Sequence, residues 1–118
     1  MHDIPHMFID EKESESFHKE IRKGFLKAIL LVIIHEKPIH GYDIIQLMKE
    51  RSGGRWTPSP GSVYPALEHL EAKGYIVSEE VDRKKVYTIT PKGEQAIGKM
   101  NEMRNEMLRD MTAFFGDL

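Results

Sequence analysis

WTPSPGSVYPALEHL, residues 56–70, is the stretch of sequence that decides the fold. Pro58 and Pro60 fix φ and hold the residues before them extended, so the stretch begins as a turn. Ser59 is a favourable N-cap and Pro60 a favourable first helical residue, because proline has no N–H to leave unpaired there. Apolar residues then recur at helical spacing, which predicts a helix with one narrow buried stripe formed by Val63, Leu67 and Leu70.

The other face of this helix carries Ser59, Ser62 and His69. Pro65 lies about one and a half turns inside the helix, where its ring removes one backbone hydrogen bond and presses on the carbonyl of Gly61. We therefore expect an exposed first turn whose N–H groups and hydroxyls suit phosphates and base edges. Any one of these residues alone would also fit a capped core helix, and the neighbouring segments favour the functional interpretation.

The composition is that of one globular domain, with 118 residues of which 40% are hydrophobic and 31% charged. Cysteine is absent, which excludes disulfides and thiolate chemistry and is compatible with a reducing cytoplasm. The longest apolar run, residues 28–34, is far short of the roughly 18 residues that span a bilayer. The acidic, polar N-terminus lacks the pattern of a signal peptide. We expect a cytoplasmic protein that does not enter a membrane.

Residues 1–12 show no clear periodicity and are interpreted as a flexible N-terminal arm. His2, Asp3 and His6 could be metal ligands, but no fixed scaffold holds them, so we predict no metal site. Asp10 and Glu13 have capping-box spacing, which predicts a helix beginning near this point.

The first helix, from Glu13, is polar up to Arg22 and then apolar nearly all round as far as Ile34. Such a helix is covered on more than one side, and a domain of this size can hardly cover it alone. We therefore expect a partner surface to contribute. Pro38 ends the helix, because proline disfavours the helical conformation at the residue before it.

A second helix follows His40-Gly41-Tyr42-Asp43-Ile44 and runs through about Arg51, with Ser52-Gly53-Gly54 as its stop signal. Together with the helix after Ser59 it forms a pair of short helices joined by a turn. The second of the pair opens on small hydroxyl residues, which is the helix-turn-helix arrangement.

Two strands follow the third helix, which Gly74 closes as a C-terminal cap. Residues 75–81 and 85–90 are rich enough in β-branched and aromatic side chains to be strands. Between them lies Asp82-Arg83-Lys84, followed by Lys85, and adjacent cations at a hairpin tip can reach a phosphate or enter a minor groove. Charges at a hairpin tip are more often simply solvated. Directly after a recognition helix, this hairpin is expected to be the wing of a winged helix.

Thr90-Pro91 repeats the cap-then-proline signal and begins the last helix. Its long apolar stripe needs a surface to pack against, and the economical choice is a second copy of the chain. A ligand-accommodating interface is compatible with its adaptable methionines, although a plain homodimer core is favoured. The residues assigned to the dimer interface are Phe25, Ile29, Ile33, Met100, Met103, Met107, Met111 and Phe114.

The fold class predicted is mainly α with a small β-hairpin: a winged helix-turn-helix at 13–90, after the arm at 1–12, and a long C-terminal dimerisation helix at 91–118. The segments Lys23-Gly24-Phe25-Leu26, His40 to Ile44, Trp56 to Leu70, Gly74, and Tyr87-Thr88-Ile89-Thr90 before Lys92-Gly93 resemble the PadR family of winged-helix transcriptional regulators. The resemblance covers residues 23–93 in the expected order, and SPGSVYPAL is its most specific part. The single C-terminal helix resembles the small subfamily.

The resemblance implies a homodimer that binds double-stranded DNA at a palindromic operator, in most members as a repressor. Some members release DNA on binding a planar aromatic or multidrug-like compound, which implies a possible small-molecule effector at the dimer interface. By position, the residues predicted to bind DNA are Tyr42, Ser59, Ser62, Tyr64, His69, Arg83, Lys84 and Lys85. Tyr64 could equally be a core residue with its hydroxyl at the surface.

Two alternatives remain. A winged-helix module that binds protein fits the net charge of −2, because DNA binding requires basic residues concentrated on one face. An enzyme is disfavoured, because the sequence has no glycine-rich phosphate loop, no nucleophile with an adjacent base and no metal-ligand cluster. We therefore predict no catalytic residues and no cofactor.

Overall fold

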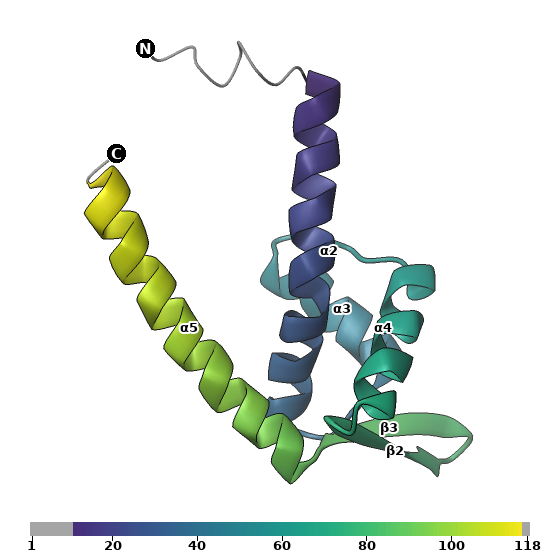
Figure 1. Ribbon diagram of the computed structural model, residues 1–118. Helices are drawn as coiled ribbons and strands as arrows, with labels where there is room; N and C mark the ends of the chain where they lie inside the picture. Colours follow the sequence, from purple (N-terminus) through teal and green to yellow (C-terminus); the bar gives the residue numbers. More distant parts are fainter. Residues whose placement is uncertain (1–10, 117–118) are drawn as a thin grey trace.

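The computed structural model describes residues 11–116, and it confirms a mainly helical chain with a small antiparallel sheet and a long C-terminal helix (Figure 1). Most of the predicted arm lies outside the described residues, and so does the metal interpretation of His2, Asp3 and His6. In chain order the elements are α2 (Glu11–Glu36), β1 (Ile39–His40), α3 (Gly41–Arg51), α4 (Pro60–Ala72), β2 (Ile76–Val81), β3 (Lys84–Ile89) and α5 (Pro91–Phe115).

The helix ends follow local signals in the sequence. Helix α2 begins at Glu11, slightly before the predicted start, and α3 ends at Arg51 as predicted. Gly74 has a φ of +82°, and the Tyr75 N–H beyond it donates to the Leu70 carbonyl at 3.0 Å, which closes α4 with a glycine C-cap. Helix α5 begins where predicted, because Thr90 occupies the N-cap and Pro91 the first turn.

The sheet has a third strand that the sequence analysis missed. Its order is β1-β3-β2, and both pairings are antiparallel. Strand β1 pairs Ile39 with Tyr87 and His40 with Val86. A segment of two residues has no alternating pattern to detect, and its pairing with a distant strand leaves no local trace. The hairpin strands also begin and end within a residue or two of the predicted bounds.

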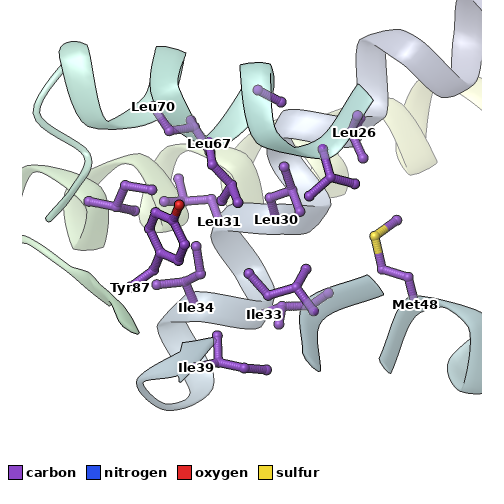
Figure 2. Packing of buried hydrophobic residues seen from close by; sticks show 14 of the residues in the cluster. Leu26, Leu30, Leu31, Ile33, Ile34, Ile39, Met48, Leu67, Leu70 and Tyr87 are labelled. Atoms are coloured by element: carbon purple, nitrogen blue, oxygen red, sulfur yellow. The ribbon is translucent and has the colours of Figure 1, made fainter. Parts of the chain in front are cut away.

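The hydrophobic core lies between the second half of α2, helices α3 and α4, and the sheet (Figure 2). Its largest fully buried side chains are Leu30, Ile34, Ile44, Leu67, Ile76 and Val63. Truncating one buried leucine or isoleucine to alanine costs about 2–5 kcal/mol, so this cluster carries most of the stability of the fold. Apart from Tyr87, whose ring carries a hydroxyl, no polar or charged side chain among the described residues is buried.

Helix α2 is the element on which the others pack. Its C-terminal half contacts α4, α5 and β3, while its N-terminal half extends away from the core (Figure 1). The chain covers Leu26, Leu30, Leu31, Ile33 and Ile34 by itself, so the apolar run needs a partner only for what remains exposed. No helix in residues 11–116 combines the length and the hydropathy that crossing a bilayer requires.

The start of α5 is fastened to the turn that follows α4. The Thr90 hydroxyl donates to the Gly74 carbonyl at 2.6 Å and accepts from the Gly93 N–H at 3.1 Å. The Thr90 N–H donates to the Tyr75 carbonyl at 3.1 Å. A β-carbon at position 93 would lie only 2.2 Å from the same Tyr75 oxygen. Backbone contacts therefore set the direction in which α5 leaves the core.

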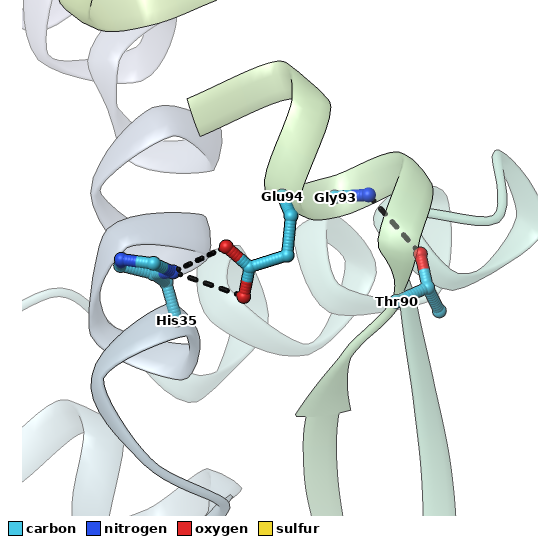
Figure 3. A network of polar contacts seen from close by, with 4 residues as sticks. All are labelled: His35, Thr90, Gly93 and Glu94. Atoms are coloured by element: carbon cyan, nitrogen blue, oxygen red, sulfur yellow. Dashed lines mark hydrogen bonds and ion pairs between the residues drawn. The ribbon is translucent and has the colours of Figure 1, made fainter. Parts of the chain in front are cut away.

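A side-chain contact links α5 to α2 at the same end. The Nδ1 atom of His35 lies 3.0 Å from Oε2 of Glu94, next to the Thr90 cap (Figure 3). Both side chains are close to half exposed, so this contact adds at most a fraction of a kcal/mol. It orients α5 beside α2 and is not a major source of stability.

Candidate nucleic-acid interface

The first turn of α4 exposes two hydroxyl groups. Ser59 holds the N-cap position with an extended backbone, and its carbonyl accepts the N–H groups of Ser62 and Val63, each at 3.0 Å. Its side chain does not cap the helix but donates to the Ser62 hydroxyl at 3.2 Å. Both serines are exposed, so the Ser62 O–H can donate to a phosphate oxygen or to an acceptor on a base edge, and both hydroxyl oxygens can accept from a donor on a base edge.

Tyr64 and Tyr42 lie at the junction of α3 and α4. The Tyr64 ring is 39% exposed and rests on Gly41, the first residue of α3. This is intermediate between the two roles left open for Tyr64, since one side of the ring packs and the other is accessible. Tyr42 is 65% exposed, and its hydroxyl accepts from Gln46 Nε2 at 3.4 Å. Both phenol groups therefore face solvent beside the turn of the helix pair.

His69 continues the exposed row that begins at Ser62. Pro65 is exposed between them, and the three residues lie along one side of α4 at helical spacing. The buried stripe of the same helix consists of Val63, Ala66, Leu67 and Leu70. The pattern of exposed and buried residues predicted for this helix is therefore present in the structure.

The hairpin has a tight tip formed by Asp82 and Arg83, which have φ values of 51° and 67°. Positive φ at both central residues of a two-residue loop is the geometry of a type I′ turn. Lys84 pairs with Val81 as the first residue of β3 and is not part of the tip. Arg83, Lys84 and Lys85 are all exposed.

Acidic residues lie beside the cations of the hairpin. Lys85 lies opposite Glu80 in the register of the two strands, and Glu79 follows opposite Val86. Opposite charges at facing positions of a sheet attract, which reduces the net positive field at the base of the hairpin. Arg83 and Lys84, nearest the tip, are therefore the cations best placed to meet a phosphate.

Glu71, a residue that the sequence analysis did not single out, fixes the hairpin relative to α4. Its Oε2 atom accepts from the Ser78 hydroxyl at 2.7 Å and from the Ser78 N–H at 3.1 Å. Burial, and next the charge of Glu71, raises the pKa of the nearby Tyr87 hydroxyl above its ordinary value, so Tyr87 stays neutral under physiological conditions. Only the fold brings position 71 to position 78, so no local pattern could have identified this contact.

A second exposed surface lies on α5. Met103, Met107, Leu108, Met111, Phe114 and Phe115 are each more than half exposed, and Phe25 on α2 is 51% exposed. Contiguous apolar exposure of this kind marks an interaction surface.

Three residues predicted for the dimer interface are not part of this exposed surface. Ile33 is only 2% exposed and belongs to the chain's own core, while Ile29 and Met100 are partly buried against that core.

No group of three or more His, Asp or Glu side chains within residues 11–116 has an arrangement that could hold a metal ion. The arrangement offers instead an exposed helix tip with hydroxyls, a hairpin tip with cations and an uncovered apolar helix face.

Comparison with known proteins gives a family match. A model described as the transcriptional regulator PadR-like family matches residues 29–99. The transcriptional regulator YqjI of Escherichia coli is 33% identical over 88 residues, which cover 74% of this chain and 42% of that protein. The chain thus spans less than half the length of this relative. The transcriptional regulator Rv3488 of Mycobacterium tuberculosis is 35% identical over 91 residues, which cover 71% of this chain and 82% of that protein.

Solved structures match as well. A PadR-like transcription factor from Bacteroides fragilis superposes with a TM-score of 0.72 at 27% identity, covering 83% of this chain and 97% of that one. Bacillus subtilis PadR in complex with operator DNA has a TM-score of 0.59 at 30% identity, covering 64% of this chain and 45% of that one. The same protein in complex with p-coumaric acid has a TM-score of 0.54 at 29% identity, covering 64% and 43%.

Proposed function

This chain belongs to the PadR-like family of transcriptional regulators, and from that premise we propose that it represses transcription by binding a palindromic operator as a homodimer. The family confirms the resemblance found in the sequence and the prediction that the chain is a regulator and not an enzyme. The proposal goes beyond family membership in three points: the palindromic operator, the repression and the homodimer.

The observation that carries the DNA-binding proposal is the exposed hydroxyl pair at the first turn of α4. Ser59 and Ser62 hydrogen-bond to each other and have no packing role, and Arg83 and Lys84 extend from the hairpin that follows the same helix. In this proposal α4 enters the major groove, and the hairpin cations neutralise phosphates beside it. That Bacillus subtilis PadR has been solved on operator DNA supports this arrangement.

The homodimer is supported by the apolar face of α5. Met103, Met107 and Met111 are 59%, 53% and 55% exposed, and Phe114 is 84% exposed. A two-fold pair would cover this face with the α2 and α5 helices of the second copy. It would also present two copies of α4, and half-sites on DNA lie about 34 Å apart when they are one helical turn apart.

Release of DNA by a small aromatic or hydrophobic effector is also part of the proposal. Bacillus subtilis PadR has been solved with p-coumaric acid, which supports an effector for this chain by family analogy alone. The dimer interface remains one place for such a compound, because its methionines can repack around a guest.

A selection from a random-sequence duplex pool, followed by mobility shifts across a salt series, tests the DNA-binding proposal. We expect enrichment of inverted repeats and an affinity that falls steeply with salt, with a slope of about −0.9 for each phosphate neutralised. A winged-helix module that binds protein would enrich no sequence and show a flat salt response. Lys99→Ala is the control for Lys84→Ala. It makes the same change of charge at an exposed lysine on α5, away from α4 and the hairpin.

A further inference from the structure

The hairpin of β2 and β3 is held from both sides at one level between its base and its tip. Tyr87, on the central strand β3, pairs with Ile39 of β1 on one side. Ser78 of β2 lies opposite Tyr87 in the register and bonds to Glu71 of α4 on the other side. Residues 79–85 continue past these contacts and form the tip. The direction of the tip therefore depends on β1 and on Glu71.

The Ser78 N–H lies on the free edge of the sheet. In a hairpin with a two-residue turn, the residues that flank the turn exchange backbone hydrogen bonds, and every second pair does so after them. By this alternation Val81, Glu79 and Val77 bond to β3, whereas the Ser78 N–H points away from it. Glu71 Oε2 accepts this N–H at 3.1 Å and the Ser78 hydroxyl at 2.7 Å. One carboxylate oxygen thus satisfies two donors, in bonds that its charge strengthens.

These two bonds are the polar link between the hairpin strands and α4. Within residues 11–116 no other hydrogen bond or ion pair joins β2 or β3 to that helix. From Ser78 the strand runs on to Val81, a distance of about 10 Å at about 3.3 Å per residue. A tilt of about 20° about Ser78 would move that end by about 3–4 Å, which is further than a hydrogen bond to a phosphate tolerates.

A carboxylate on α4 is unexpected in an element proposed to face a polyanion. By charge alone, removing Glu71 should strengthen DNA binding, because one repulsion with the phosphates disappears. Glu68 lies on the same helix and is exposed, and it makes no hydrogen bond or ion pair in the part of the chain that the structure describes. The two acids therefore allow the effect of charge to be separated from the effect of position.

We propose that Glu71 is a positioning residue for the hairpin: its bonds to Ser78 hold the cations of the hairpin at the angle at which they reach phosphates while α4 occupies the major groove. The effect on phosphate contacts rests on the proposed function, whereas the anchoring of the hairpin does not. Loss of the Glu71 carboxylate therefore weakens DNA binding, although it removes a negative charge, and loss of the Glu68 carboxylate strengthens it.

The anchoring is tested without DNA, on the full-length protein. Glu71→Ala and Glu71→Gln remove the same charge, but only glutamine keeps an oxygen that can accept from Ser78. In Glu71→Ala we expect the Ser78 amide to exchange with solvent at least about tenfold faster, and the NMR order parameters at Arg83 and Lys84 to fall below about 0.6. In Glu71→Gln both quantities should stay near the wild-type values.

The effect on phosphate contacts is measured on labelled DNA from the selection, across a salt series. Glu71→Ala should weaken binding severalfold and reduce the salt slope by up to about two, because Arg83 and Lys84 no longer neutralise phosphates. Glu71→Gln should not weaken binding, and Glu68→Ala should strengthen it. Lys84→Ala should have little further effect in the Glu71→Ala background, since its cation is already displaced. A loss of stability alone would leave the salt slope unchanged.

A rigid hairpin in Glu71→Ala, an unchanged salt slope in that variant, or an equal loss of affinity in Glu71→Gln would each overturn the proposal. Should Glu71→Ala fail to fold by circular dichroism, Ser78→Ala removes the shorter bond alone and should produce the same changes at smaller size; a wild-type hairpin and slope in that variant would also contradict it. If the wild-type protein bound no DNA at any salt concentration, the proposed function would fail, and the mobility of the hairpin would still decide whether Glu71 anchors it.

Discussion

The ring of Tyr64 lies against the backbone of Gly41, so closely that a β-carbon at position 41 would be 2.8 Å from Tyr64 Cε1 and 3.3 Å from its hydroxyl oxygen. Gly41 begins α3 and Tyr64 lies in the second turn of α4. The contact therefore places the two helices of the helix-turn-helix relative to each other, and it needs a residue without a side chain at position 41.

Replacing Gly41 with alanine should displace the Tyr64 ring and cost about 1–3 kcal/mol of folding free energy, the range for overfilling a packed position. A double-mutant cycle with Tyr64→Ala checks the cause. In the Tyr64→Ala background, Gly41→Ala should be nearly neutral, because the clash is gone and alanine favours a helix. Equal costs in both backgrounds, measured by urea unfolding, would exclude the Tyr64 contact as the reason for the glycine.

Two glycines of α5 should respond to alanine in opposite directions. At Gly93 a β-carbon would meet the Tyr75 carbonyl oxygen at 2.2 Å, so Gly93→Ala should destabilise the fold by about 3 kcal/mol or more. At Gly98 nothing lies within 4 Å, so Gly98→Ala should stabilise the helix by about 0.5–1 kcal/mol. Thermal and urea unfolding at one protomer concentration measure both; similar effects would contradict the close approach at Gly93.

The helix bounds were predictable because their causes are local. Proline at the first turn and serine or threonine at the N-cap act within one turn of helix, and Ser59-Pro60 and Thr90-Pro91 mark the starts of α4 and α5. Strand β1 was not predictable, because only its pairing with β3 makes residues 39–40 a strand.

In the candidate site, too, the features with local causes were predictable and those that depend on distant contacts were not. The hydroxyl tip of α4 is formed by residues close together in sequence, whereas the hydrogen bonds from Ser78 to Glu71 join positions that only the packing of the hairpin against α4 brings together. Ile33 was assigned to the dimer interface because an apolar helix does not reveal which of its faces the chain itself covers. The structure leaves Phe25 exposed and buries Ile33.

Arg83 has a strained backbone at the hairpin tip, so replacing it should increase stability and decrease DNA affinity. Arg83 has a φ of 67°, where glycine is favoured, and Asp-Gly is a preferred pair for this turn. Arg83→Gly should therefore raise the unfolding free energy by about 0.5–1 kcal/mol while weakening DNA binding, with the salt slope reduced by about one. Arg83→Gln removes the same charge and keeps the strain, so it should weaken binding without the gain. A stabilisation shared by both variants would argue against strain.

Ser62→Ala combined with Lys84→Ala should weaken operator binding while the fold remains intact by circular dichroism. Lys84 should account for a drop of about one in the salt slope and Ser62 for a loss that salt does not change, because only the lysine neutralises a phosphate. Mobility shifts on the two single variants separate these effects. Unchanged affinity in the double variant would remove both residues from the interface.

Met107→Glu should dissociate the proposed homodimer, because it places a charge in the apolar face of α5, where Met107 is 53% exposed in a single chain. Asn105→Glu adds the same charge on the opposite side of the helix and should leave the assembly unchanged. Sedimentation velocity distinguishes the two outcomes. A Met107→Glu protein that still sediments with twice the protomer mass would mean that another surface holds the copies together.

The hydroxyl of Thr90 also couples the orientation of α5 to that of α4. Because it joins the turn after α4 to the first turn of α5, we expect pivoting of α5 about its base to displace the end of α4, the proposed recognition helix. The separation of the two DNA-reading helices in a paired molecule would then be governed by residues 73–75 and 90–93, a short rigid joint, more than by the length of the helices that meet.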